Sequence, residues 1–71
     1  MYWRKISDSK PINGKKVLLC RKGNLRFSVF TNEYGGYWEE YGDEYISYKA
    51  EDDDKWIYID EVISDANYDS L

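Results

Sequence analysis

The sequence predicts a mostly β domain: a small twisted antiparallel sheet or partly closed barrel of four to five strands with little helix. Short runs rich in β-branched and aromatic residues recur along the chain, and glycine, asparagine and proline separate them at close intervals. A length of 71 residues suits one small core, and 18% aromatic residues supply large side chains to fill it. We therefore expect residues 1–71 to form a single domain, with a polar tail over residues 64–71 that can fray.

The first half of the chain predicts an edge segment followed by a β-hairpin. The opening YWRKIS, residues 2–7, should end at the turn residues of KPINGKK, residues 10–16. KVLLCRK, residues 16–22, and LRFSVFT, residues 25–31, lie on either side of a Gly-Asn turn, which is the pattern of a hairpin. Apolar and polar side chains alternate in the second arm, so we expect its apolar face to enter the core. The residues of that face are Leu25, Phe27 and Val29.

The segment YGGYWEEYGDEYISY, residues 34–48, admits two structures. Its tyrosines recur at spacings of three and four, which is typical of one face of a helix. Gly42 would interrupt such a helix, and tyrosine-rich runs have poor helix propensity. Gly42-Asp43 is turn chemistry, whereas tyrosine, tryptophan and isoleucine favour strands. These propensities favour a bent pair of strands over a helix.

The last third predicts an acidic loop and a final strand. EDDD, residues 51–54, has the composition of a solvated loop, and KWIYIDEVI, residues 55–63, that of a strand. Alternation should place Ile57 and Ile59 on one face and Trp56 and Tyr58 on the other. The ten residues expected in the core are Ile6, Val17, Leu19, Leu25, Phe27, Val29, Trp38, Ile46, Ile57 and Ile59.

Composition excludes several classes of function. The chain has no histidine and only one cysteine, Cys20, which excludes histidine general-base catalysis and Cys/His zinc sites. Acidic pairs such as Glu39/Glu40 belong to no glycosidase or calcium-loop motif, so we expect no enzymatic activity, metal or cofactor. Cys20 lies in an apolar run and should be a small buried hydrophobe. A lone thiol, with no signal peptide or membrane-spanning run, predicts a protein of the bacterial cytoplasm.

The charges divide unevenly along the chain. Residues 1–27 carry eight cations against Asp8 alone, a net +7, and residues 28–71 carry two cations against thirteen carboxylates, a net −11. Together they give the net charge of −4. Such asymmetry indicates either an interaction surface or complementarity between strands from the two halves. The basic half could bind single-stranded nucleic acid, but the net negative charge argues against direct binding.

Carboxylates and aromatic rings concentrate between residues 33 and 54. This segment holds nine carboxylates against Lys49 alone. Spaced carboxylates on a β scaffold can imitate the charges of a nucleic-acid backbone, and neighbouring tyrosine and tryptophan rings would anchor a partner. The alternative is a solvated acidic face with half-buried tyrosines beneath it. The residues expected to bind the partner are Tyr37, Trp38, Glu39, Glu40, Tyr41, Asp43, Glu44, Tyr45, Asp52, Asp53 and Asp54.

The start of the chain is similar to a known family. WRKISDSKPINGKKVLLC, residues 3–20, resembles the first part of a small bacterial and phage domain catalogued as domain of unknown function 551, which typically reads W-I-x-V/I-x-D/E-x-x-P-x-x-G-x-x-V-L-V. The corresponding residues are Trp3, Ile6, Asp8, Pro11, Gly14, Val17 and Leu18. Residues 25–38 resemble the strand and glycine-rich turn that follow, whereas the family's H-W-M-P-L-P ending is matched only at Trp56. The resemblance implies a small β-rich domain of phage and prophage accessory genes with no assigned enzymatic activity.

These features favour a non-enzymatic binding protein of phage or mobile-element type. We expect an inhibitor that occupies the basic groove of a host nucleic-acid-binding protein, such as a defence nuclease or a CRISPR complex. A second hypothesis is an oligomeric sponge for a nucleotide-like small molecule, and a third is a structural interaction module. Exposed sheet edges would also permit a homodimer by strand addition. The sponge would use Trp3, Arg4, Arg21 and Arg26.

Overall fold

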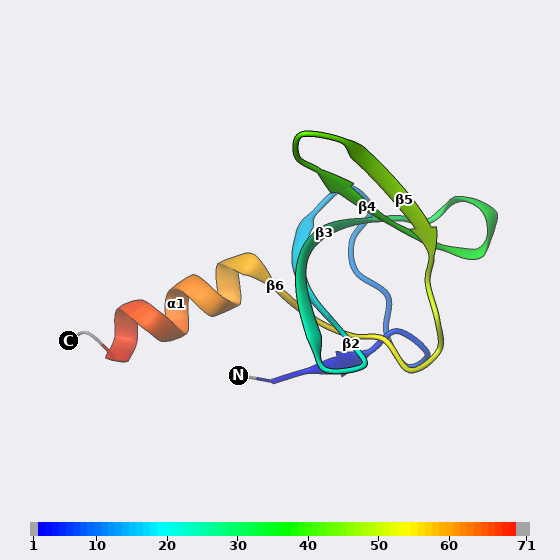
Figure 1. Cartoon of the computed structure of the whole chain (residues 1–71). Helices are drawn as coiled ribbons and strands as arrows, with labels where there is room; N and C mark the ends of the chain where they lie inside the picture. Colours follow the sequence, from blue (N-terminus) through cyan, green and yellow to red (C-terminus); the bar gives the residue numbers. More distant parts are fainter. Residues whose placement is uncertain (1, 70–71) are drawn as a thin grey trace.

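The computed structural model describes residues 2–69, with side chains through Ser64, as one open sheet followed by a helix (Figure 1). Six strands lie in the order β1-β6-β2-β3-β4-β5, and every neighbouring pair is antiparallel. The prediction of a mostly β antiparallel sheet is confirmed, whereas four to five strands and a partly closed barrel are wrong. The elements are β1 (Arg4–Lys5), β2 (Lys16–Arg21), β3 (Asn24–Thr31), η1 (Glu33–Gly35), β4 (Tyr37–Tyr41), β5 (Tyr45–Lys49), β6 (Lys55–Tyr58) and α1 (Ile59–Asp69).

The position of β6 explains both the extra strand and the open sheet. It lies between β1 and β2, so Arg4 from the start of the chain pairs with Trp56, and Leu18 pairs with Ile57. The opening segment is therefore drawn into the sheet as a sixth strand. It contributes only two residues, and the other edge strand, β5, lies at the opposite end of the sheet order (Figure 1). Neither edge pairs with the other, and the sheet does not close.

A two-residue turn, Lys22-Gly23, joins β2 to β3. Both residues have positive φ, 51° at Lys22 and 82° at Gly23, and Arg21 pairs with Asn24 across them. Two consecutive left-handed residues form a type I′ turn, whose twist matches that of the two strands. The predicted hairpin is confirmed, with its turn one residue earlier than the Gly-Asn pair.

Five of the ten predicted core residues are buried. Phe30 and Trp56 are buried as well, and the Phe30 ring packs edge-on against Trp38 with centroids 5.3 Å apart. Most of these side chains cluster on one face of the sheet, which we call the inner face. The confirmed residues are Ile6, Val17, Leu19, Trp38 and Ile57.

The register between β2 and β3 decides which face of β3 enters the core. Val17 is buried and pairs with Ser28, so Ser28 and Phe30 point inward. The predicted alternation in β3 is thus present, but its apolar stripe faces outward and the prediction that it enters the core is wrong. Leu25 and Phe27 are 60% and 75% exposed, and Val29 is half-buried.

Three further expectations are corrected by position in the fold. Ile46 is 45% exposed because it lies on the edge strand β5. Ile59 is only half-buried because it begins the helix instead of continuing the last strand. Cys20 is half-buried, not buried, because it faces outward opposite the exposed Leu25.

The chain leaves the sheet as helix α1, which projects away from it (Figure 1). The strand predicted over residues 55–63 therefore ends at Tyr58. The tail predicted to fray is helical through Asp69, and residues 70–71 lie outside the described residues. Asp60 and Glu61 in the first turn complement the helix dipole, and Glu61 Oε1 accepts a hydrogen bond of 3.3 Å from the Tyr58 backbone N–H. This return contact explains why the helix starts where a strand was expected.

Candidate partner-binding surface

Strands β4 and β5 form a hairpin at the edge of the sheet, so the bent-strand interpretation of residues 34–48 is confirmed over the helical one. Side chains alternate between its two faces. The outer face carries Tyr37, Glu39, Tyr41, Tyr45, Ser47 and Lys49. The inner face carries Trp38, Glu40, Ile46 and Tyr48. One continuous sequence therefore supplies both core and surface.

The loop before β4 holds a tyrosine out into solvent. Tyr34 is 84% exposed and has a φ of 52°, and Gly35 and Gly36 follow with φ of 85° and 109°. A left-handed conformation costs a non-glycine residue about 1–2 kcal/mol. Gly36 is required by packing as well, because a Cβ built on it would lie 2.9 Å from Phe30 Cζ. The two glycines therefore allow the tight turn that keeps the Tyr34 ring exposed.

Two pairs of tyrosines lie at the two ends of the outer hairpin face. Tyr34 and Tyr37 meet edge to face with ring centroids 6.5 Å apart, and Tyr41 and Tyr45 pair across the strands with centroids 5.5 Å apart. Tyr41 is 68% exposed and Tyr45 60%. Residues 37 and 41 are separated along β4 by roughly 14 Å, at about 3.4 Å per residue. The surface therefore offers two aromatic contacts on a rigid strand pair.

Glu39 lies between these two pairs and is held in place by its neighbours. Its Oε1 accepts a hydrogen bond of 2.5 Å from Thr31 Oγ1, and its Oε2 accepts one of 2.5 Å from the Tyr41 hydroxyl. The bond from Thr31, followed by that from Tyr41, lowers the pKa of Glu39, and donating its hydroxyl proton to this carboxylate raises the pKa of Tyr41. Glu39 is therefore a fixed negative charge at neutral pH.

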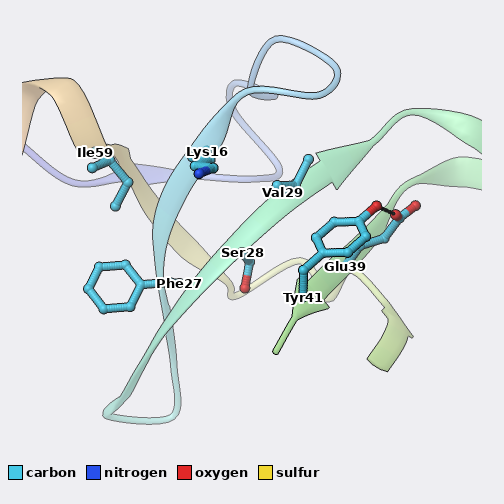
Figure 2. A pocket seen from close by; sticks show the side chains of 7 residues that line it. All are labelled: Lys16, Phe27, Ser28, Val29, Glu39, Tyr41 and Ile59. Atoms are coloured by element: carbon cyan, nitrogen blue, oxygen red, sulfur yellow. Dashed lines mark hydrogen bonds between the residues drawn. The ribbon is translucent and has the colours of Figure 1, made fainter. Parts of the chain in front are cut away.

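Two hollows open on the outer face, and Glu39 borders both. One, of about 290 Å³, runs beside β3. Figure 2 shows Phe27 and Ile59 on one side of β3 and the hydrogen-bonded Glu39 and Tyr41 on the other. The second hollow, of about 210 Å³, lies between η1 and the hairpin. Its lining residues are Thr31, Glu33, Tyr34, Tyr37, Glu39, Tyr45 and Ser47.

We call the outward-facing acidic and aromatic residues of this region the hairpin surface. Asp43 and Glu44 belong to it because they are exposed in the turn between the strands. Glu33 and Tyr34 were not among the predicted site residues, although the glycine pair that follows them indicated a special turn. The hairpin surface consists of Glu33, Tyr34, Tyr37, Glu39, Tyr41, Asp43, Glu44 and Tyr45.

Trp38 and Asp54, two of the predicted contact residues, lie inside the fold. They are 0% and 1% exposed, and Trp38 Nε1 donates a hydrogen bond of 2.7 Å to Asp54 Oδ2. Arg21 donates two more to the same carboxylate, at 2.8 Å and 2.6 Å. Burial alone would raise the pKa of Asp54, but the bonds from Arg21, the Glu51 N–H and Trp38 outweigh it and lower the pKa. Both residues serve the core.

Glu40 points to the inner face, away from the other predicted carboxylates. It accepts hydrogen bonds of 3.1 Å and 3.2 Å from Arg26 Nη1, and another from the Tyr48 hydroxyl. Its side chain is 18% exposed, and that of Arg26 is 49% exposed. Glu40 therefore braces β4 against β3 and β5 instead of facing a partner.

Asp52 and Asp53 are exposed, but they lie at the far end of β5 from the hairpin turn. The five residues of β5 separate the two acidic loops by roughly 17 Å at about 3.3 Å per residue. The structure thus divides the acidic segment into two groups. Of the two acidic loops, only the one that contains Asp43 and Glu44 adjoins the exposed tyrosines of the hairpin.

The ion pairs explain the charge asymmetry of the sequence. Each pair among the described residues joins a cation from residues 1–27 to a carboxylate from residues 28–71. Complementarity between the two halves is therefore confirmed. The carboxylates of the hairpin surface form no ion pair with any described residue. Their negative charge is therefore not neutralised by these residues. The pairs are Arg4–Glu61, Lys15–Asp60, Arg21–Glu51, Arg21–Asp54 and Arg26–Glu40.

Neither similarity to known proteins nor a metal-binding arrangement among the described residues indicates a function for this chain. No protein-family model matches the chain, and comparison with curated proteins and solved structures finds no match. Among the side chains that the structure describes, residues 2–64, no group of three or more acidic or cysteine residues is arranged to hold a metal ion. No helix within residues 2–69 has the length and apolar character needed to cross a membrane. The hairpin surface is therefore the feature of the molecule that indicates a function.

Proposed function

We propose that this chain is a non-enzymatic binding protein whose hairpin surface occupies a basic groove of a nucleic-acid-handling protein. The observation that carries the proposal is the combination, on the hairpin surface, of well-exposed tyrosines and of carboxylates that form no ion pair with the described residues. Residues 33–49 hold five carboxylates, of which Glu40 is taken by Arg26, against Lys49 as their one cation. Such a face attracts a positively charged surface.

The two residue types would contribute differently to binding. Tyrosines are enriched among residues that dominate interface energies, because a large rigid ring with a polar tip loses little entropy on contact. Tyr34, Tyr41 and Tyr45 are exposed enough to be buried by a partner. The carboxylates would mainly guide association and select against acidic partners, in a manner that salt screens.

The alternative of a sponge for a nucleotide-like molecule is less well supported. It requires arginines that are free to bind phosphate. All three arginines of the chain are instead joined to carboxylates, with Arg4 and Arg21 each making two hydrogen bonds to one carboxyl group. A phosphate would have to break an existing pair. The acidic and aromatic surface is the better candidate site.

The resemblance of residues 3–20 to a phage and prophage domain family suggests the setting. A small cytoplasmic protein of that origin, with an acidic surface aimed at basic grooves, would act as an inhibitor of a bacterial defence nuclease or CRISPR complex. Displacing nucleic acid requires only that the groove be filled. Such an inhibitor needs no catalytic residue or cofactor.

The proposal is tested by capture from a bacterial lysate at low and high salt, followed by mass spectrometry and affinity measurement. A basic nucleic-acid-binding protein should be retained at low salt and released at high salt. Reversing Asp43 and Glu44 to lysine should weaken its binding at least about 30-fold, since each lost contact is worth roughly 1 kcal/mol. The matched control reverses Asp52 and Asp53, which carry the same charge in the other loop.

The outcomes separate the mechanisms. A control variant that binds within about threefold of the wild type, beside a weakened hairpin variant, supports the hairpin surface. Equal losses in the two variants would indicate a response to net charge alone and would overturn the assignment of the site. Capture that is indifferent to salt, or limited to acidic partners, would overturn the proposed function.

A further inference from the structure

The smaller hollow has the composition of a site for a cationic side chain. Glu33 and Glu39 border it together with the rings of Tyr34, Tyr37 and Tyr45, and no lysine or arginine lines it. Carboxylates and aromatic faces both attract a cation, the first by charge and the second through the ring quadrupole. A volume of about 210 Å³ is below the range usual for whole small-molecule ligands, which suits one inserted side chain.

The walls of the hollow are held in position by hydrogen bonds within the protein itself. Glu39 is fixed by Thr31 and Tyr41 from two neighbouring positions on the sheet. The other wall is supported by the backbone of Gly36, whose N–H donates to the Glu33 carbonyl at 2.9 Å and whose carbonyl accepts from the Ala50 N–H at 3.0 Å. A site whose walls are already ordered loses less entropy on binding.

Arginine fits these walls better than lysine. A guanidinium is planar, so it can stack on a tyrosine ring while directing its N–H groups at carboxylates in its own plane. Each carboxylate oxygen of Glu39 already accepts one hydrogen bond and retains capacity for another. An ammonium group would meet the charge but not the stacked geometry. The carboxylates and rings together therefore favour a guanidinium.

We infer that this hollow receives an arginine side chain of the partner, an inference that rests on the proposed function and specifies how the hairpin surface recognises its target. Basic grooves that follow nucleic acid are rich in arginine, since its fork matches phosphate oxygens. A hollow that presents carboxylates in place of phosphate would engage the same side chain. Recognition then depends on one inserted residue as well as on overall charge.

The test is an NMR titration of the ¹⁵N-labelled full chain with the blocked peptide acetyl-Gly-Arg-Gly-amide. Two peptides of the same design, with lysine or with neutral citrulline in place of arginine, serve as controls. The arginine peptide should shift amide signals around the hollow, in residues 31–47, and the citrulline peptide should lose at least about fivefold in affinity. Equal binding of the arginine and citrulline peptides, or shifts confined to other regions, would overturn the inference.

Variants locate the site and control for folding. Glu39→Gln should lower the affinity for the arginine peptide about fivefold. Asp52→Asn, which changes an exposed carboxylate outside the hollow, should leave this affinity unchanged. Tyr34→Gly removes a ring that lines the hollow, and glycine readily adopts the left-handed backbone at this position. The NMR spectrum of the variant should therefore remain that of a folded protein, and its affinity for the arginine peptide should fall. Unchanged affinity in both Glu39→Gln and Tyr34→Gly would overturn the inference.

The peptide result is independent of the partner result. If the peptide does not bind but the Asp43 and Glu44 reversal still abolishes capture, the arginine site is wrong and the proposed function stands. If the peptide binds with the expected selectivity but no basic protein is captured, the hollow is an arginine site and the proposed target class is wrong.

Discussion

Replacing Asp54 with alanine is expected to cost the fold about 3–5 kcal/mol. The carboxylate is 1% exposed and accepts hydrogen bonds from Arg21, the Trp38 indole and the Glu51 backbone N–H, at 2.6–2.8 Å. Removing one member of a buried ion pair typically costs this much, because the other charge loses its compensation. A domain of 71 residues has a total stability of about 4–11 kcal/mol, at 0.05–0.15 kcal/mol per residue. The expected loss is therefore between roughly a quarter and the whole of this stability.

The assay is urea unfolding followed by tryptophan fluorescence, which reports on Trp38 together with Trp3 and Trp56. Asp52→Ala is the matched control, since Asp52 is an exposed aspartate in the same loop and should change the free energy of unfolding by no more than about 0.5 kcal/mol. The double variant Arg21→Ala/Asp54→Ala should be more stable than the sum of the single losses by at least about 1 kcal/mol. A loss below about 1 kcal/mol in Asp54→Ala, or strict additivity, would refute the role assigned to this carboxylate.

Three further predictions concern stability. Lys22→Asn should stabilise the protein by about 0.5–1 kcal/mol, measured as a higher Tm, because asparagine tolerates the left-handed position of the type I′ turn better than lysine. Gly36→Ala should destabilise it by at least about 2 kcal/mol in urea, since the added Cβ meets Phe30 and φ is 109°. The pKa values of Asp54 and Glu61 are lowered on folding, so their contributions are present above the unfolded values near pH 4 and are lost as the pH falls through the lower folded values. Urea midpoints measured from pH 6 to pH 2 should therefore fall, and Asp54→Ala should show a shallower fall.

The sequence predicts the strands and turns better than it predicts which face is buried. Glycines and asparagine mark the β2–β3 turn, and Gly42 marks the β4–β5 turn, through local conformational preferences. In β3, however, large apolar side chains occur on both faces, with Phe27 on one and Phe30 on the other. The choice depends on partners distant in sequence: β2 places Val17 opposite Ser28, and β4 places Trp38 opposite Phe30. Alternation alone contains no such information.

The same limit applies to the acidic loop, in which Glu51, Asp52 and Asp53 are exposed as predicted and only Asp54 is buried. In the run from Glu51 to Asp54, four neighbouring carboxylates look equally solvated. Asp54 is buried because Arg21 and Trp38, which are distant in sequence, converge on it. The helix that follows β6 was missed for a different reason, since isoleucine and valine near Ile59 favour a strand locally. The capping contact from Glu61 and its bond to Arg4 favour the helix instead.

Because side chains alternate between the two faces of β4, substitutions at adjacent positions of this strand should have different effects on stability and on binding. Glu39 and Glu40 are adjacent and chemically identical, yet Glu40 faces inward to Arg26 and Tyr48 while Glu39 faces outward between the tyrosines. Glu40→Gln should therefore lower the free energy of unfolding by about 1 kcal/mol, as expected for a partly exposed pair with an added hydrogen bond, and leave partner affinity unchanged. Glu39→Gln leaves weaker acceptors for Thr31 and Tyr41, so it should also lower the urea midpoint, but it alone of the two substitutions should weaken binding of the partner. If both substitutions reduced affinity equally, or if Glu40→Gln alone reduced it, the outer face would not be the binding face.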